Sequence, residues 1–248
     1  MPSQSPETVV LPDADALAQA AAERIAARFR GADGRIAFCL TGGHSPERLY
    51  ELLAAEPYRE TLPWDRIHVF LGDDRYVPHH DALSNFAMAR ALLLDQVPLP
   101  PGNIHPIPTG AGNVDEDARR YEAELRDFYG AERLDPKRPL FDVVLMGVGD
   151  DGHTASLFPG RPELDERDRW VVGLPQAGHP PFVPRITLTF PAMASTHDML
   201  FLVSGRGKRE IVARVLSGAD LPAARAHSHG KLAWLLDRDA QGEQCDVD

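Results

Sequence analysis

The sequence of 248 residues is poor in cysteine and has no long apolar run. Its two cysteines, Cys39 in an apolar segment and Cys245 in a polar one, give no hint of a disulfide and have no metal-type spacing. This is typical of proteins from reducing compartments. No segment approaches the roughly 18 apolar residues of a membrane span, and residues 1–12 lack the regions of a secretory signal. We therefore expect a cytoplasmic protein with no membrane partner.

Basic residues are in the minority as well. The chain has 26 Lys and Arg against 37 Asp and Glu, which gives a net charge of −11. Nucleic acids and anionic membranes repel an acidic protein, and no basic helix-turn-helix pattern occurs, so we expect no nucleic-acid partner. A small anion can still bind to a local cluster of Arg, Lys and backbone N–H groups.

Short β-rich apolar segments alternate with longer segments of helical spacing. Strands are expected at residues 36–40, 67–71, 141–148, 170–174, 186–189, 199–203 and 233–236. Helices are expected at residues 13–30, 85–94, 114–129 and 208–216, and one more begins with Ser45 as its N-cap and Pro46 as its first residue. The alternation predicts an α/β fold in a single domain, residues 1–248, with a mostly parallel sheet and helices on both faces.

The loop after Leu40 is suited to binding a phosphate, because ligands of such sheets lie at the carboxyl ends of the strands. Gly42 and Gly43 let the backbone approach a ligand, and Thr41 and Ser45 add hydroxyl donors. The helix that follows directs free N–H groups toward the same place. A P-loop is excluded, since its Lys-Ser/Thr pair is missing. A tight, capped strand-to-helix turn is the structural alternative.

Charged residues follow the next expected strand in the order Asp73, Asp74, Arg75. Two carboxylates and an arginine directly after a strand are poorly explained by sheet packing. The two aspartates point in different directions, so at most one is expected to face the site. An ion pair that braces the turn is the alternative, and Ser84 could simply be the N-cap of the helix that follows.

The strongest signal comes from residues 147–156. They contain the pattern G-x-G-x-x-G, which suggests a dinucleotide site. Asp150 and Asp151 would repel a pyrophosphate there, and residues 158–160, Phe-Pro-Gly, leave little room for the long helix that such a site requires. A histidine beside carboxylates suits proton transfer near neutral pH instead. We therefore expect His153 to be functional rather than structural.

Two further basic residues, Arg185 and Lys208, are candidates for binding a phosphate. Arginine offers a bidentate fork, and Lys208 is a point charge that follows a glycine turn at the start of a helix. Taken singly, each could be a surface charge. The other nine of the ten histidines rank below His153 as candidates. Residues 171–185, rich in proline and glycine, are the least regular stretch and a candidate mobile loop over the site.

Together these loops resemble the 6-phosphogluconolactonase family. The matching segments are residues 40–46, 72–78 with 84–85, 147–160, 185–189 and 204–208. Of these, residues 149–160, Gly-Asp-Asp-Gly-His-Thr-Ala-Ser-Leu-Phe-Pro-Gly, are highly specific. One departure is Asp74, which stands where the family usually has Glu. The shorter side chain puts in doubt a direct contact from that position.

The resemblance implies a Rossmann-like fold and hydrolysis of 6-phospho-D-glucono-1,5-lactone in the oxidative pentose phosphate pathway. It gives His153 the place of the general base. Asp151 or Asp73 would orient the imidazole or the water. Arg75 or backbone N–H groups would stabilise the oxyanion. The phosphate would be bound by Thr41, Gly42, Gly43, Ser45, Arg185 and Lys208. A δ-lactone is a reactive ester, so neither a metal nor a cofactor is expected. The oligomeric state, monomer or small homo-oligomer, stays open.

Two other functions stay open as alternatives. Glucosamine-6-phosphate deaminases resemble this chain around Asp-Gly-His but carry a Glu, which pairs with the His, where this chain has Phe158. A non-catalytic sugar-phosphate-binding protein would need Arg185 and Lys208, but not Asp151 beside His153. Release of ammonia from glucosamine 6-phosphate would indicate the first alternative, and binding without turnover would indicate the second.

Overall fold

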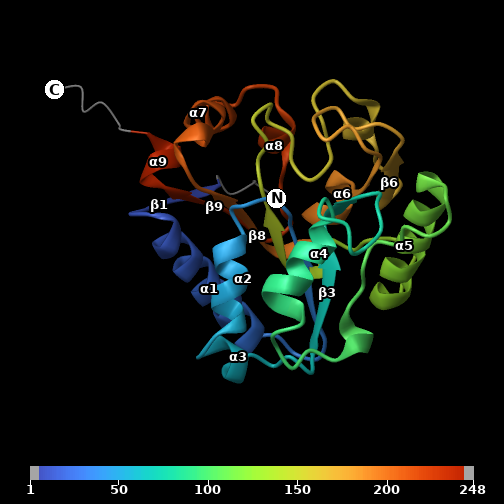
Figure 1. Ribbon diagram of the computed structural model, residues 1–248, viewed down its shortest axis with the longest axis horizontal. Helices are drawn as coiled ribbons and strands as arrows, with labels where there is room; N and C mark the ends of the chain where they lie inside the picture. The colour runs from blue at the N-terminus through green and yellow to red at the C-terminus, as the bar shows by residue number, and fades with distance from the viewer. Residues whose placement is uncertain (1–5, 243–248) are drawn as a thin grey trace.

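The computed structural model describes residues 6–242. In this part of the chain, a six-stranded parallel sheet with the order β1-β9-β8-β5-β2-β3 runs through the centre of the molecule (Figure 1). Its strands are β1 (Glu7–Leu11), β2 (Ile36–Leu40), β3 (Ile67–Leu71), β5 (Phe141–Met146), β8 (Thr196–Val203) and β9 (Lys231–Asp237). The predicted α/β fold with a mostly parallel sheet is therefore confirmed.

The central strands explain why the sequence predicted this sheet. Every residue of β2 is buried, because helices cover a parallel sheet on both faces. Such strands appear in a sequence as short, continuous apolar segments. The edge strand β1 was not predicted, since it is largely exposed and mixes polar with apolar residues. Cys39 is a free, buried thiol in β2, and Cys245 lies outside the described residues.

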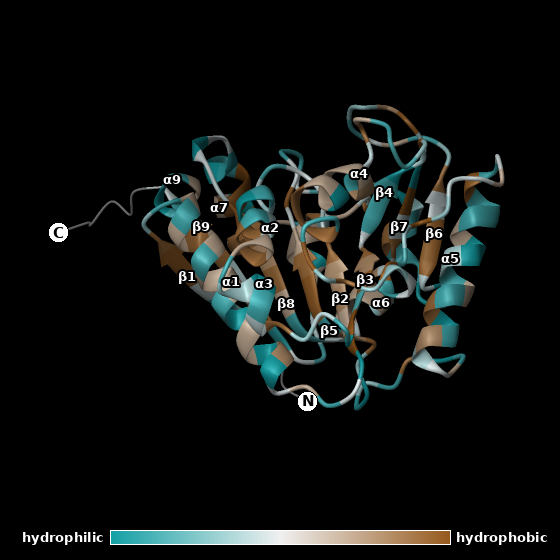
Figure 2. Cartoon of the chain, turned by 60° about the horizontal axis from the view of Figure 1, so that its bottom comes forward, coloured by the Kyte–Doolittle hydropathy of each residue, from teal (hydrophilic) through white to brown (hydrophobic). Residues whose placement is uncertain are grey.

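Helices flank the sheet, and Figure 2 shows apolar strands between helices that carry polar residues on their surfaces. Asp13 caps α1 (Ala14–Arg30) by accepting a hydrogen bond from Ala16 N over 2.8 Å, and the alanine-rich side of this helix is buried. The other helices are α2 (Glu47–Ala54), α3 (Tyr58–Thr61), α4 (Asn85–Ala89), α5 (Val114–Tyr129), α6 (Phe190–Ala194), α7 (Arg209–Leu216), α8 (Pro222–Arg225) and α9 (Arg238–Gln241). No helix within residues 6–242 is long and apolar enough to cross a membrane.

A small antiparallel sheet extends the structure beyond β3. Its order is β4 (Asp73–Arg75), β7 (Arg185–Leu188) and β6 (Val171–Leu174). Residues 171–185, expected to be the least regular stretch, begin with β6, which lies within the strand expected at 170–174, and end at the first residue of β7. The irregular part is the loop of residues 175–184, which joins these two strands.

The start of α2 also differs from the expectation. Pro46, rather than Ser45, is the N-cap, and no side chain caps this helix. The turn is closed by a hydrogen bond from Glu47 N to His44 O over 3.2 Å. In contrast, Ser84 is the N-cap of α4, as the sequence suggested, and accepts a hydrogen bond from Ala87 N over 3.2 Å.

A partly buried histidine in β3 predicts how stability depends on pH. His68 Nδ1 lies 3.0 Å from His105 Nε2, and burial, with the positive charges of His105 and Arg35, lowers the pKa of His68 to about 4. The unfolded chain takes up this proton near pH 6.5, its ordinary pKa, whereas the folded chain does so only near pH 4. The free energy of unfolding therefore decreases as the pH falls through this interval.

We expect the variant His68→Gln to lose less thermal stability than the wild type between these two pH values. Thermal unfolding of both proteins across the interval measures the difference in Tm. Parallel curves of Tm against pH would contradict this role of His68.

Candidate active site

A cleft of about 500 Å³ lies at the carboxyl ends of β2, β5 and β8. These strands are parallel and close together in the sheet, so loops that are distant in the sequence meet here. Nearly all residues that the sequence predicted for the site line this cleft, namely Thr41, Gly42, Gly43, Ser45, Asp73, Arg75, His153, Arg185 and Lys208. The remaining one, Asp151, is hydrogen-bonded to His153.

The imidazole of His153 is held in place by Asp151. Its Nδ1 lies 2.5 Å from Asp151 Oδ1, which also accepts a hydrogen bond from His153 N over 3.0 Å. Burial raises the pKa of Asp151, but the hydrogen bonds from His153 outweigh burial and lower this pKa to about 2. The carboxylate therefore stays charged near neutral pH. A neutral His153 then carries its proton on Nδ1, which leaves Nε2 free to accept one.

The glycine-rich loop is shaped around this side chain. A Cβ atom at Gly149 would overlap the His153 ring, and Gly152 has a φ of +86°, which favours glycine. Gly149 N donates a hydrogen bond to His153 O over 2.8 Å and closes the loop. The next helical turn is a short 3-10 segment, Pro162–Asp165. The long helix of a dinucleotide site is thus missing after this loop, as the sequence predicted.

The two adjacent aspartates of β4 have separate partners. Asp74 is buried and accepts hydrogen bonds from backbone N–H groups at the start of α4, including Asn85 N over 2.6 Å. Asp73 lines the cleft and accepts a hydrogen bond from Ser156 Oγ over 2.6 Å. One aspartate faces the site, as expected, while the other caps α4. Of the two carboxylates considered as partners of the imidazole, Asp151 makes the contact, whereas the hydrogen bonds of Asp73 go to Ser156 and Asn85.

Two arginines at the cleft have donors that lack acceptors. Arg185 is 4% exposed, and its Nη2 donates to Pro181 O over 2.9 Å, while its buried Nε has no acceptor among the described residues. The buried Nε of Arg75 likewise lacks one, although its Nη1 donates to Leu83 O over 2.5 Å. Arg75 forms no ion pair with an aspartate within residues 6–242, so the structural alternative predicted for it does not occur. Unpaired buried donors are costly, so both arginines are suited to an anionic ligand.

The third basic group, Lys208, has a partner in this structure. Its Nζ lies 2.5 Å from Oδ1 of Asp150, the exposed aspartate of the glycine-rich loop. Lys208 is the residue that precedes α7, after a turn at Gly205, as the sequence suggested. The ammonium group has three donors, so it can still donate to an anion beside the Asp150 carboxylate.

Two buried tyrosines fix the strand ends that lead into the cleft. The Tyr50 hydroxyl of α2 accepts a hydrogen bond from Thr41 N over 3.1 Å and donates one to Thr41 O over 2.7 Å. The Tyr121 hydroxyl of α5 makes the same pair of bonds with Leu71, over 2.9 and 3.0 Å. The backbone at the ends of β2 and β3 is thus held by the helices that pack beside the sheet.

The cleft also contains residues that the sequence analysis did not select. The amide of Asn85 fills the space beside Gly42, where a Cβ atom would overlap it. His179, one of the histidines ranked below His153, lines the cleft, and its ring centroid lies 5.5 Å from that of His153. The position of His179 in Gly-His-Pro-Pro, within the loop expected to cover the site, is the sequence signal that could have identified it.

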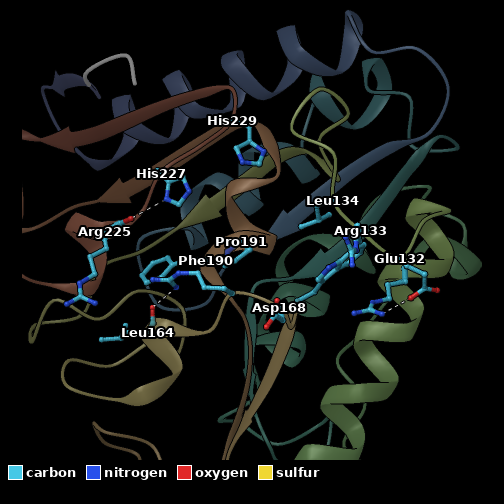
Figure 3. Close-up of a pocket in the computed structure, with 13 residues that line it drawn as sticks. Glu132, Arg133, Leu134, Leu164, Asp168, Phe190, Pro191, Arg225, His227 and His229 are labelled. Atoms are coloured by element: carbon cyan, nitrogen blue, oxygen red, sulfur yellow. Dashed lines mark hydrogen bonds and ion pairs between the residues drawn. The ribbon is translucent and has the colours of Figure 1, made fainter. Parts of the chain in front are cut away.

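A second hollow, of about 870 Å³, lies near the start of β9 and contains none of the predicted site residues (Figure 3). Two of its arginines are already paired: Arg126 with Glu132, and Arg225 with Asp220. Within residues 6–242, no group of three or more His, Cys, Asp or Glu side chains is arranged to hold a metal ion. The predicted acid–base and anion-binding groups thus meet in the cleft and not in this hollow.

Fold and cleft together define a class of protein. It is an α/β protein in which a histidine–carboxylate pair faces a cleft bordered by basic side chains and glycine-rich loops. This arrangement suits acid–base chemistry on a small, anionic molecule.

Comparison with known proteins identifies the family within this class. The family described as glucosamine-6-phosphate isomerases/6-phosphogluconolactonase matches residues 12–234, and the chain belongs to it. The 6-phosphogluconolactonase of a Synechocystis species is 43% identical over 211 residues, 84% of either chain. That of a Nostoc species is 41% identical and covers 94% of this chain and 96% of its own. The solved structure of 6-phosphogluconolactonase from Thermotoga maritima, 30% identical, covers 94% of this chain and 100% of its own with a TM-score of 0.81.

Proposed function

We propose that this protein is a 6-phosphogluconolactonase, which hydrolyses 6-phospho-D-glucono-1,5-lactone to 6-phosphogluconate in the oxidative pentose phosphate pathway. The observation that carries the proposal is the His153 imidazole, fixed by Asp151 and facing a cleft that contains unpaired arginine donors. The names of the relatives support the same reaction.

His153 is the general base in this mechanism. Its free Nε2 takes a proton from water while the water oxygen attacks the lactone carbonyl carbon, C1. Asp151 keeps the imidazole in the tautomer that leaves Nε2 unprotonated, and its negative charge stabilises the imidazolium that forms. General-base catalysis of this kind contributes about 10²–10⁴-fold.

The other groups of the cleft act on the remaining parts of the substrate. Arg75, or backbone N–H groups of the glycine-rich loops, stabilise the oxyanion that develops at C1. The loop of residues 41–45, with Arg185 and Lys208, binds the phosphate. Lys208 has donors for a phosphate oxygen besides the one that contacts the Asp150 carboxylate. Asp73 positions the loop that carries His153 through its hydrogen bond with Ser156.

The surroundings of His153 argue against a deaminase. The ring of Phe158 lies 4.8 Å from the His153 ring, between centroids, at the place where deaminases carry a glutamate that pairs with the histidine. A phenylalanine provides no proton acceptor for ring opening of an amino sugar phosphate. We therefore expect no ammonia from glucosamine 6-phosphate.

The deciding experiment compares the hydrolysis of freshly generated 6-phosphogluconolactone with that of unphosphorylated gluconolactone, each corrected for spontaneous opening. We expect a kcat/KM at least about 10²-fold higher for the phosphorylated lactone, because hydrogen bonds to charged groups contribute about 1.5–3 kcal/mol each. Equal rates on the two lactones would overturn the phosphate site. Binding without turnover would overturn the proposed reaction.

A further inference from the structure

A second imidazole faces the same cleft as His153. The ring centroid of His179 lies 5.5 Å from that of His153, with an angle of 43° between the ring planes. His179 Nδ1 lies 3.0 Å from Pro180 O and can donate its proton there, which leaves Nε2 available to another partner. A positive charge on His179 would add to the lowering of the Asp151 pKa, which burial raises and the hydrogen bonds with His153 lower.

Phe158 is the common support of the two histidines. Its ring packs against the His153 ring, and its Cβ lies 2.8 Å from the place that a Cβ at Gly178 would occupy. Phe158 also belongs to a small apolar cluster with Leu174 and Ala177, at the start of the loop that carries His179. This loop is therefore packed onto the glycine-rich loop, which fixes the distance between the two imidazoles.

The lactone reaction, on which this inference rests, requires two proton transfers, each at an oxygen that is bonded to C1 in the tetrahedral intermediate. The first takes a proton from the attacking water, and the second gives a proton to the ring oxygen when the C1–O5 bond breaks. Both oxygens are bonded to C1 in the tetrahedral intermediate but point in different directions. Two imidazoles whose ring centroids lie 5.5 Å apart can therefore each be within hydrogen-bond reach of one oxygen, about 2.6–3.2 Å.

We propose that His179 is a second catalytic residue, the general acid that protonates the ring oxygen while His153 acts as the general base. His153 gains the proton of water, His179 loses one to O5, and C1 becomes a carboxyl group while C5 carries a hydroxyl group. The carboxyl group then ionises, and proton exchange with solvent restores both histidines. No oxidant, reductant or second substrate is required.

The charged and titratable groups around His179 come from several elements. Asp151 and His153 belong to the glycine-rich loop, Arg185 begins β7 at the end of the His179 loop, and Arg161 Nη2 donates to Gln176 O of the same loop over 2.6 Å. Asp151 is the negative charge of this set.

The test measures kcat, KM and the pH profile of kcat for His179→Gln with 6-phosphogluconolactone. We expect kcat to fall by about 10²-fold at nearly unchanged KM, and the decrease of kcat at alkaline pH to disappear, since that limb reports the proton of the acid. His227→Gln, an exposed histidine outside the cleft, is the matched control and keeps the wild-type kcat and pH profile.

A second variant tests the position of His179 while its chemistry is kept. Gly178→Ala places a methyl group against Phe158 and should lower kcat while the alkaline limb remains. A loss confined to KM in His179→Gln would assign the residue to substrate binding and overturn the proposal, as would a wild-type kcat or an unchanged alkaline limb. If the wild type hydrolyses the lactone but His179→Gln matches it, the proposed function stands and this inference fails. If the wild type does not hydrolyse it, both fail.

Discussion

Replacing His153 by glutamine is expected to lower kcat for 6-phosphogluconolactone by about 10²–10⁴-fold and to leave KM close to the wild-type value. Glutamine has a similar reach but cannot take a proton from water. KM is spared because, within residues 6–242, no hydrogen bond or ion pair joins the proposed phosphate-binding residues to this imidazole. Steady-state kinetics, corrected for spontaneous lactone opening, measures the effect.

The same variant should keep its fold. His153 is partly exposed in the cleft, and the bonds that close its loop come from backbone atoms such as Gly149 N and His153 O. The Tm of His153→Gln should therefore lie close to that of the wild type. A variant that retains most of its kcat would remove His153 from the mechanism, and a large decrease in Tm would mean that lost activity reports lost structure.

Replacing Arg185 by methionine should affect the phosphorylated lactone selectively. We expect kcat/KM for 6-phosphogluconolactone to fall about 10- to 100-fold, mostly through KM, because hydrogen bonds to charged groups contribute about 1.5–3 kcal/mol. Activity on unphosphorylated gluconolactone should change little. Kinetics with both substrates measures the difference, with Arg30→Met, an exposed position on α1 outside the cleft, as the control.

The stability of this Arg185 variant distinguishes binding from a structural role. Burial lowers the pKa of Arg185, and the Asp73 carboxylate opposes that shift. Burying the charged guanidinium therefore lowers the free energy of unfolding. Its replacement by an apolar side chain of similar length should not lower Tm. If Arg185 instead braced the His179 loop through Pro181 O, Tm would decrease and both substrates would be affected alike.

The sequence predicted those parts of the fold whose pattern is local. Residues 36–40 and 114–129 were predicted as a strand and a helix with the bounds that β2 and α5 have, because burial on both faces and helical spacing are visible in the sequence itself. Strand β4 could not be predicted this way. Its sequence, Asp-Asp-Arg, has no strand pattern, and it exists because it pairs with β7, more than a hundred residues away.

In the candidate site as well, residues with a local sequence signal were predicted, and those that depend on tertiary packing were not. The loops at the strand ends identified His153 and Lys208, since parallel strands bring those loops to one edge of the sheet, whereas Arg185 begins β7 of the small antiparallel sheet. The choice of Asp151 over Asp73 as the imidazole partner depends on the path of the glycine-rich loop, which the spacing did not specify. His179 reaches the cleft through the packing of its loop on Phe158, a contact between residues distant in sequence. The catalytic roles of all these residues stay predictions.

The glycine at position 149 gives the G-x-G-x-x-G spacing a different meaning in this protein. In dinucleotide-binding folds, the second glycine of that pattern leaves space for a pyrophosphate to approach the backbone. Here the same missing side chain leaves space for the protein's own imidazole, which a Cβ atom would displace. One spacing can thus make room either for a cofactor or for a side chain of the protein itself, and the carboxylates beside it indicate which. In a Gly149→Ala variant, the Cβ atom would overlap the present position of the His153 ring.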